Sequence, residues 1–327
     1  MNIFLTMDYE LFFGEVSGSA KKCLIEPTEK ILSISKKHNV GITYFVDAGY
    51  LLRLEHYMLE YSGLKSTYNE IVKQLKELLK KGNDIQLHIH PHWESAVFDG
   101  ENWQMNIDGN YKLIDFEDYQ IFKIVNKYKN GLERIIEREV NTCRAGGMSI
   151  QPFYRIKNAY KKNGIKYDSS VFPGGAFESD NYNFNYLTAP KKGRYSFEDD
   201  VCVEEENGRF TEIPIAGWKY HPMFYLKQNI SKKINPKWHT KFGDGKTIPQ
   251  KKMKHQHFRI SNWNTVNCDG FFAQKLPQIT KHYAQKKRTD LVIIGQSKSA
   301  TYYSLEKLDK FIGTFKANHS FLTFKEL

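Results

Sequence analysis

Three histidines lie within five residues of the segment QLHIHPHW: His88, His90 and His92. In the alternating run that precedes them, His88 and His90 share one face of a predicted strand, opposite an apolar face, and Pro91 ends the strand. Imidazoles that converge at a strand end can offer neutral nitrogen ligands to a divalent metal. The alternative is three unrelated histidines, one buried and two solvated. Their close spacing favours a metal-binding or catalytic role.

Other predicted strands also end in polar side chains. These are Asp8 and Glu10, Arg144, Asp168 and Gln296. The carboxyl ends of parallel strands in an α/β barrel form one rim, so these groups are predicted to lie near the histidines. Two imidazoles and one carboxylate can hold a metal that activates water, and a second carboxylate held by Arg144 can accept the proton. The alternative for Asp8 and Glu10 is a solvated turn after a strand.

Strand and helix patterns alternate along the chain. Strands are predicted at residues 2–7, 41–46, 84–90, 142–145, 165–169, 210–215, 291–294 and 321–324, and helices at 27–38, 67–82, 116–139, 152–163, 271–286 and 305–315. Thr67 with Glu70 resembles a capping box, and Gly131 is a potential break in the third helix. The alternation predicts an α/β fold with a parallel sheet, either a barrel or a doubly wound sheet. Both chain ends belong to it, which favours one domain (1–327) containing a basic insertion or lid at 218–267.

Composition narrows the function classes. The net charge of +11 is compatible with binding to nucleic acid, to an anionic membrane surface or to phosphate-bearing substrates, and it can also serve solubility alone. No helix-turn-helix, RNP-type or zinc-finger signature supports nucleic acid, and no apolar run reaches the roughly 20 residues of a membrane span. The amino terminus lacks the pattern of a signal peptide. The four cysteines are scattered, which fits a reducing compartment, and a cytoplasmic location is expected.

Three segments resemble motifs of the NodB-homology polysaccharide deacetylases, carbohydrate esterase family 4. Residues 6–10 (TMDYE) are similar to the motif TFDDG, residues 82–88 (GNDIQLH) to the segment that carries the metal-binding histidines, and residues 143–147 (CRAGG) to the motif of the arginine. The resemblance is to a divergent branch found in surface-polysaccharide gene clusters, and it covers most of the chain outside 218–267.

The resemblance implies a distorted (β/α)7-8 barrel of the glycoside hydrolase/deacetylase type and a divalent metal, with zinc expected. It implies that Asp8 is the catalytic base, that Arg144 orients it, and that His88 and His92 bind the metal. Glu10 would replace an aspartate ligand of the family, because Tyr9 stands at that position. His90 is additional, and since strand geometry favours His88 with His90, the second imidazole ligand is left open between His90 and His92.

The family also carries a histidine that protonates the leaving amine, and this chain has Gln296 there. An amide does not titrate near neutral pH. Either Lys298 or His221 supplies the proton, or catalysis is weak, directed at a bond with a better leaving group, or absent. The segment 213–215 and Trp218 are candidates for the family's apolar wall. Trp93, Asp168, Trp218 and Lys298 are the predicted substrate-binding residues.

The predicted function is therefore a metal-dependent deacetylase acting on an N-acylated sugar, nucleotide-linked or lipid-linked, in surface-glycan biosynthesis. One alternative is a glycan-binding protein of the same fold without turnover. Another is a glycoside hydrolase that uses Asp8 with Asp168 or Glu212. Nucleic-acid binding ranks last. Four further histidines are read as solvated loop residues rather than a second metal site: His221, His239, His255 and His257.

Overall fold

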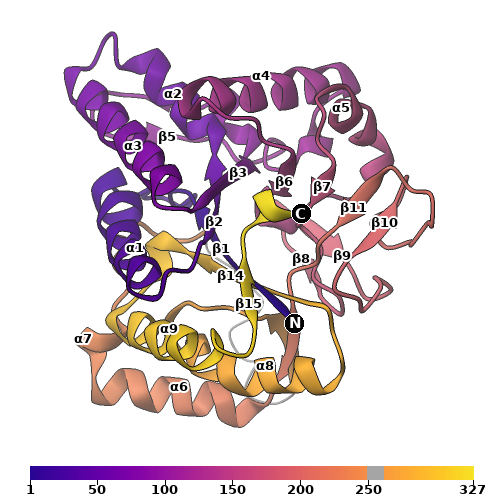
Figure 1. Ribbon diagram of the computed structural model, residues 1–327. Coiled ribbons are helices and arrows are strands. Elements are labelled where there is room, and N and C mark those ends of the chain that lie inside the picture. The colour runs from indigo at the N-terminus through magenta and orange to yellow at the C-terminus, as the bar shows by residue number, and fades with distance from the viewer. Residues whose placement is uncertain (249–260) are drawn as a thin grey trace.

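A curled sheet forms the centre of the computed structural model, which describes residues 1–248 and 261–327 (Figure 1). The strand order is β10-β11-β7-β6-β3-β2-β1-β14, and β15 also pairs with β1. Pairing within this sheet is parallel except between β10 and β11. The strands are β1 (Asn2–Tyr9), β2 (Thr43–Asp47), β3 (Asp84–Ile89), β6 (Thr142–Ala145), β7 (Tyr167–Asp168), β10 (Tyr195–Phe197), β11 (Phe210–Glu212), β14 (Asp290–Gln296) and β15 (Ser320–Leu322).

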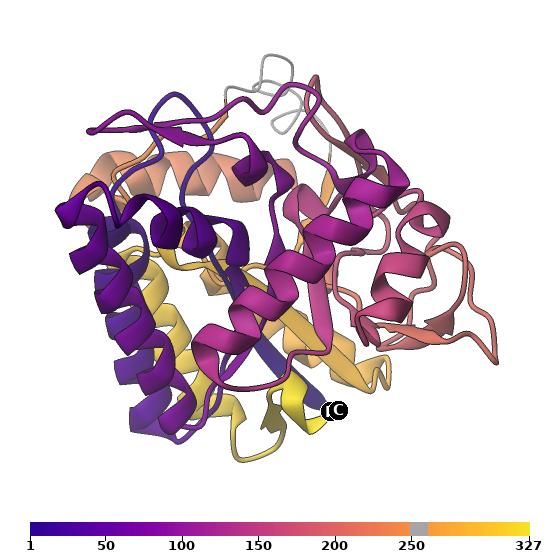
Figure 2. The ribbon, with the colours of Figure 1, turned by 90° about the horizontal axis from the view of Figure 1, so that it is seen from above.

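Helices surround most of this sheet (Figures 1 and 2). They are α1 (Glu26–His38), α2 (Ala48–Tyr57), α3 (Ser62–Lys80), α4 (Asp118–Ile136), α5 (Lys157–Lys162), α6 (Pro222–Ile234), α7 (Pro236–His239), α8 (Leu276–Gln285) and α9 (Tyr302–Phe315). Strands β2 and β3 are buried along their whole length, as expected for a parallel sheet covered by helices. Three short two-stranded antiparallel sheets lie outside it: β4 (Val97–Phe98) with β5 (Trp103–Gln104), β8 (Ala176–Glu178) with β9 (Asn183–Asn185), and β12 (Gly217–Tyr220) with β13 (Asn262–Thr265).

Two isolated bridges draw the edges of the sheet together. Ile215, just beyond β11, pairs in parallel with Val292 of β14, and Asn267 pairs with Ile294. The backbone N–H of Ala216 donates to the carbonyl of Val292 at 2.9 Å. The sheet is therefore a distorted barrel, which confirms the predicted fold class and places the carboxyl ends of its strands at one rim.

The predicted strands and helices occur in the predicted order, but some boundaries differ and the structure has further elements, such as α6 and α7. Helix α3 begins at Ser62, so the predicted capping box at Thr67 is wrong, and the Thr67 hydroxyl donates to the carbonyl of Gly63 inside the helix. Helix α4 runs unbroken through Gly131, so the potential break there is wrong. A side chain at position 131 would collide with Leu52, which indicates that glycine allows close packing there. Helix α2 was not predicted.

The basic segment 218–267 contains most of β12 and all of α6, α7 and β13. His255 and His257 lie outside the described residues, and the role of the segment as an insertion or lid stays a prediction. Within the described parts of the chain, no helix has both the length and the apolar character needed to cross a bilayer.

Candidate functional site

Three side chains converge where β1 and β3 end. Glu10 follows β1, His88 lies in β3, and His90 follows β3. The Oε2 atom of Glu10 lies 2.6 Å from Nε2 of His90 and 3.1 Å from Nε2 of His88, and these two nitrogens are 3.1 Å apart. All three side chains are buried. Their ligand atoms lie within 4.8 Å of one another, close enough to share one metal ion.

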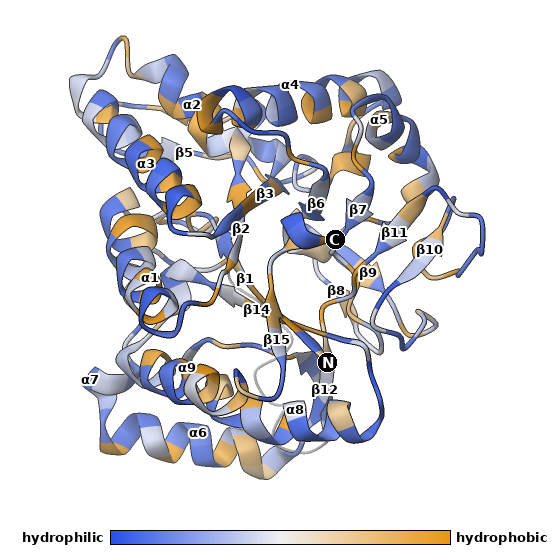
Figure 3. Ribbon diagram, in the orientation of Figure 1, coloured by the Kyte–Doolittle hydropathy of each residue, from blue (hydrophilic) through white to orange (hydrophobic). Residues whose placement is uncertain are grey.

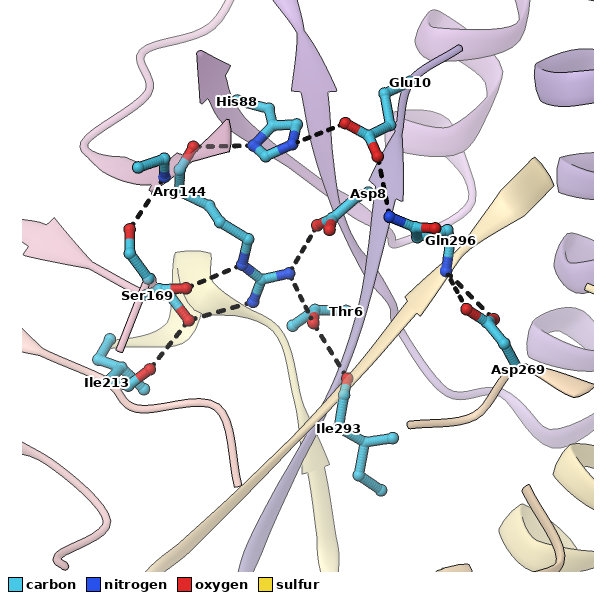
Figure 4. A network of polar contacts seen from close by, with 12 residues as sticks. Thr6, Asp8, Glu10, His88, Arg144, Ser169, Ile213, Asp269, Ile293 and Gln296 are labelled. Carbon is cyan, nitrogen blue, oxygen red and sulfur yellow. Dashed lines mark hydrogen bonds and ion pairs between the residues drawn. The ribbon is translucent and has the colours of Figure 1, made fainter. Parts of the chain in front are cut away.

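The hydrogen bonds of His88 fix which of its nitrogens faces the group. Its Nδ1 lies 2.8 Å from the carbonyl oxygen of Arg144 and donates to it, because a carbonyl can only accept (Figure 4). In the neutral ring, Nε2 then presents its lone pair toward Glu10 and His90. A backbone carbonyl behind a ligating imidazole is a common support in metal sites.

The protonation of the group also suits a cation. Burial lowers the pKa of His90 to about 4 despite the nearby Glu10 charge, so that ring is neutral near pH 7. Burial by itself would raise the pKa of Glu10, but the Lys298 ammonium and the two imidazoles hold it well below its usual range. Burial by itself would lower the pKa of His88, but its hydrogen bond to Glu10 and the charge of Asp8 raise it, so a bound cation would compete with a proton there. Two imidazole nitrogens facing each other beside a carboxylate form a donor set that fits a divalent metal such as zinc.

The second oxygen of Glu10 is held from the opposite side. Its Oε1 accepts hydrogen bonds from Nε2 of Gln296 and from Nζ of Lys298, both at 2.9 Å. Lys298 also donates to the carbonyl of Leu11 at 2.5 Å. The backbone N–H of Gln296 donates to both oxygens of Asp269 (Figure 4). Gln296 and Lys298 therefore orient Glu10 toward the two histidines.

Asp8 lies beside this group in a separate network. Its Oδ1 accepts from Arg144 at 2.7 Å, and both side chains are buried. The guanidinium also donates to the hydroxyl of Thr6, and to the carbonyl and hydroxyl of Ser169 (Figure 4). Among the described residues, the other oxygen of Asp8 accepts no hydrogen bond. Arg144 is therefore fixed in one orientation and presents Asp8 with one free oxygen.

Aromatic rings cover Glu10, His88 and His90, which are called here the metal-site group. The Phe13 ring lies 4.2 Å from the His90 ring and 4.6 Å from the His92 ring, between centroids. Tyr111 lies 5.5 Å from His90 and stacks on His92 at 5.8 Å. His90 is only 1% exposed, so a substrate reaches the group only when this cover moves.

Comparison with known proteins supports the fold. No protein-family model and no curated protein matches the chain. The solved structure of a protein from Mycobacterium smegmatis, assigned as a polysaccharide deacetylase, is similar with a TM-score of 0.57 and 12% identity over 99% of this chain and 87% of that chain. The chain shares the α/β barrel fold of that protein. At this identity the likeness concerns the fold alone.

Two weaker similarities carry no argument. A 4-alpha-glucanotransferase from Thermococcus litoralis has a TM-score of 0.48 and 11% identity over 100% of this chain and 40% of that chain. A peptidoglycan N-acetylglucosamine deacetylase has a TM-score of 0.42 and 13% identity over 99% of this chain and 86% of that chain.

The structure separates the predicted site residues into two sets. It brings together Asp8, Glu10, His88, His90, Arg144, Gln296 and Lys298. The nitrogens of His92 lie outside the metal-site group and have no hydrogen-bond partner in the described chain. Trp93 is fully buried and donates to Asp47 at 2.6 Å, so its ring faces are covered. Trp218 lines a different cavity of about 470 Å³ together with Trp263.

The outlying histidines have local partners. His221 accepts from the backbone N–H of Met223 and caps α6, and His239 bonds to the hydroxyl of Ser231 at 2.8 Å. Neither lies in a group of potential metal ligands within the described chain.

Two further acids at the rim were not predicted from the sequence. Asp47 ends β2 beside His88 in the strand register, and burial raises its pKa to about 7. Asp269 lies beside Gln296, and burial raises its pKa to about 8. The rule that polar residues at strand ends gather at the rim would have found Asp47. No local signal marked Asp269, because it lies four residues beyond the end of β13.

Asp168 and Glu212 form a buried acid pair on the neighbouring strands β7 and β11. Tyr160 donates to Asp168 at 3.0 Å, and the backbone N–H of Val171 donates to Glu212 at 3.1 Å. Burial, followed by the charge of Asp168, raises the pKa of Glu212 well above its usual range. Both acids are fully buried, and among the described residues neither forms a hydrogen bond with Asp8 or with the metal-site group. The geometry does not support the glycoside hydrolase alternative.

The raised pKa of Glu212 makes the free energy of unfolding depend on pH. The folded protein keeps a proton on Glu212 that the unfolded chain loses above a pKa of about 4.3, so this group's contribution to stability falls as pH rises. We expect Glu212→Gln to raise the melting temperature at pH 8 by about 1–2 °C, for a gain of about 1 kcal/mol. The gain should vanish near pH 4. Differential scanning calorimetry measures it, with the exposed Glu205→Gln as control. A lower melting temperature at pH 8 would mean that Glu212 is ionised.

Proposed function

We propose that this protein is a metal-dependent hydrolase that removes the acyl group from an N-acylated sugar. The observation that carries the proposal is the convergence of Glu10, His88 and His90 at the barrel rim, beside the Asp8–Arg144 pair. Zinc is the metal expected for two imidazoles and one carboxylate with open positions. When bound, such a metal supplies a Lewis acid that activates water and stabilises a developing oxyanion.

The protein's own residues have distinct roles in this proposal. Glu10, His88 and His90 would hold the metal, while Gln296 and Lys298 hold Glu10. Asp8 accepts the proton of the attacking water through its free oxygen. Arg144 orients Asp8 through their 2.7 Å ion pair.

The charge of the chain bears on the class of substrate. We propose an acetylated sugar of surface-glycan biosynthesis, carried on a nucleotide or a lipid, because the chain is strongly basic and such carriers bear phosphate. The four cysteines are buried and unpaired, which agrees with a reducing compartment and a cytoplasmic location.

Acetate release tests the proposal. The zinc-loaded protein is incubated with N-acetylglucosamine oligomers, nucleotide-linked N-acetyl sugars and lipid-linked N-acetyl sugars, and acetate is measured enzymatically. We expect release from at least one of them and loss of release after treatment with a zinc chelator. No release from any of these substrates, with zinc bound, would contradict the hydrolase proposal.

A second candidate function is glycan binding without turnover. It is favoured by Gln296, which cannot titrate and instead holds Glu10, and by the closed cover over His90. Sugar binding measured by calorimetry, without acetate release, would establish it.

Gln296→His separates the two candidates. A histidine there can still donate to Glu10 and can also protonate a leaving amine, so we expect acetate release to rise about 100-fold or more. Gln296→Asn, which cannot titrate, is the matched control and should give no rise. Equal rates in the two variants would show that the missing acid does not limit turnover.

A further inference from the structure

Helix α6 has apolar side chains on two opposite faces. The inner face packs against the molecule: the Phe224 ring lies 5.4 Å from Phe271 and 5.1 Å from Phe272. The outer face carries four exposed apolar residues, called here the α6 stripe: Met223 (51% exposed), Leu226 (44%), Ile230 (48%) and Ile234 (79%). A surface helix normally turns only one apolar face inward and is polar on the other. The α6 stripe is therefore an apolar surface that the described protein leaves uncovered.

The stripe is a continuous band along the helix. Successive helical residues are about 100° apart, so its four members fall within an arc of about 80°. Lys227 and Lys233 border this arc on its two sides by the same geometry. Just beyond α6, Trp238 of α7 is also exposed. An apolar band edged by lysines and followed by a tryptophan is typical of helices that lie in a membrane interface.

The charge around the stripe has one sign. Residues 218–243 contain no acid and six lysines: Lys219, Lys227, Lys232, Lys233, Lys237 and Lys241. None of the six forms an ion pair with any acid in the described chain. Lysines on other helices do so, such as Lys36 with Glu77 of α3. The positive charge of residues 218–243 is therefore not neutralised by acids of the described chain, so it can attract an external anionic partner.

The position of α6 allows a flat partner to reach it. Helices α6 and α7 form the lower edge of the molecule in Figure 1, outside α8 and α9. Figure 3 shows hydrophobic and hydrophilic residues alternating along α6 at this edge. A lipid surface would meet both the apolar band and its lysines at once.

We propose that α6 and α7 dock on the surface of an anionic lipid bilayer, with the α6 stripe buried among the acyl chains and the lysines on the headgroups. The cationic border favours anionic lipid over a second copy of this basic chain, because two copies would bring like charges together. This contact requires no membrane-spanning segment. It does not depend on the proposed hydrolysis.

Vesicle flotation of the full chain tests the proposal. We expect the protein to float with vesicles of phosphatidylcholine mixed with phosphatidylglycerol, to release at high salt, and to stay unbound with phosphatidylcholine alone. Lys227→Glu/Lys233→Glu should weaken binding at least about 30-fold, since each lysine near such a surface contributes about fivefold. Lys65→Glu/Lys73→Glu, on exposed lysines of α3, makes the same charge change and should have little effect.

The apolar contribution is tested without any change of charge. Ile230→Ser/Ile234→Ser should weaken flotation at least about tenfold. Leu59→Ser, at a residue that is 89% exposed elsewhere on the surface, is the matched control. Circular dichroism confirms folding of each variant. Absence of flotation, or an equal loss in the matched controls, would overturn the proposal. So would a dimer in sedimentation that Ile230→Ser/Ile234→Ser dissociates while vesicle binding is absent.

Discussion

Asp8→Asn should lower acetate release by about 100- to 10,000-fold and leave the zinc content unchanged. Asp8 lies outside the group formed by Glu10, His88 and His90, and its only described polar partners are on Arg144. The amide of asparagine keeps the shape of the side chain but cannot accept a proton from water. The loss should therefore fall on kcat rather than on KM.

The control for Asp8→Asn is an acid with a similar partner at the other end of the barrel. Asp290 begins β14 and accepts two hydrogen bonds from Arg194, at 2.8 and 2.9 Å. Asp290→Asn should leave acetate release nearly unchanged, because β14 spans about 20 Å between Asp290 and Gln296 at about 3.3 Å per residue. Zinc content by mass spectrometry and melting temperature are measured for both variants. Loss of zinc from Asp8→Asn would instead make Asp8 a metal ligand.

Local sequence was sufficient to predict the position of the histidines. Alternation in β3 puts His88 on the face opposite its apolar residues, and Pro91 ends the strand so that His90 stays beside it. The same strand-end reasoning placed Asp8, Glu10 and Arg144 at one rim, and the structure brings them together there. These predictions of position succeeded because period-2 alternation is a local property of the chain, and because the carboxyl ends of parallel strands meet at one rim whichever strands are neighbours.

Contacts between distant parts of the chain could not be predicted in this way. Gln296 was assigned from its position after a strand, but its hydrogen bond to Glu10 joins residues 286 positions apart. Trp93 was assigned to substrate, whereas the fold buries it against Asp47. The two-sided character of α6 was also missed, because a helix that is apolar on opposite faces lacks the single periodic stripe that identifies a surface helix.

The second large effect concerns the metal ligands. We expect His88→Ala and His90→Ala each to weaken zinc binding at least about 100-fold, since each removes a nitrogen directed at Glu10 Oε2. Competition with a chromophoric chelator measures the affinity, and it does not depend on turnover. Cobalt substitution gives a second readout, because its visible spectrum reports the number and type of ligands.

His92→Ala is the decisive comparison for these two variants. His92 is as deeply buried as His90, lies two residues away and packs against the same Phe13 ring, but its nitrogens are outside the metal-site group. If the geometry identifies the ligands, His92→Ala keeps its zinc while His90→Ala loses it, although both variants lose a buried ring. If His92→Ala loses zinc and His90→Ala retains it, the second imidazole ligand is His92 rather than His90. Zinc retained in all three variants would mean that Glu10, His88 and His90 are joined by hydrogen bonds alone, and the hydrolytic proposal would then fail while the barrel remained.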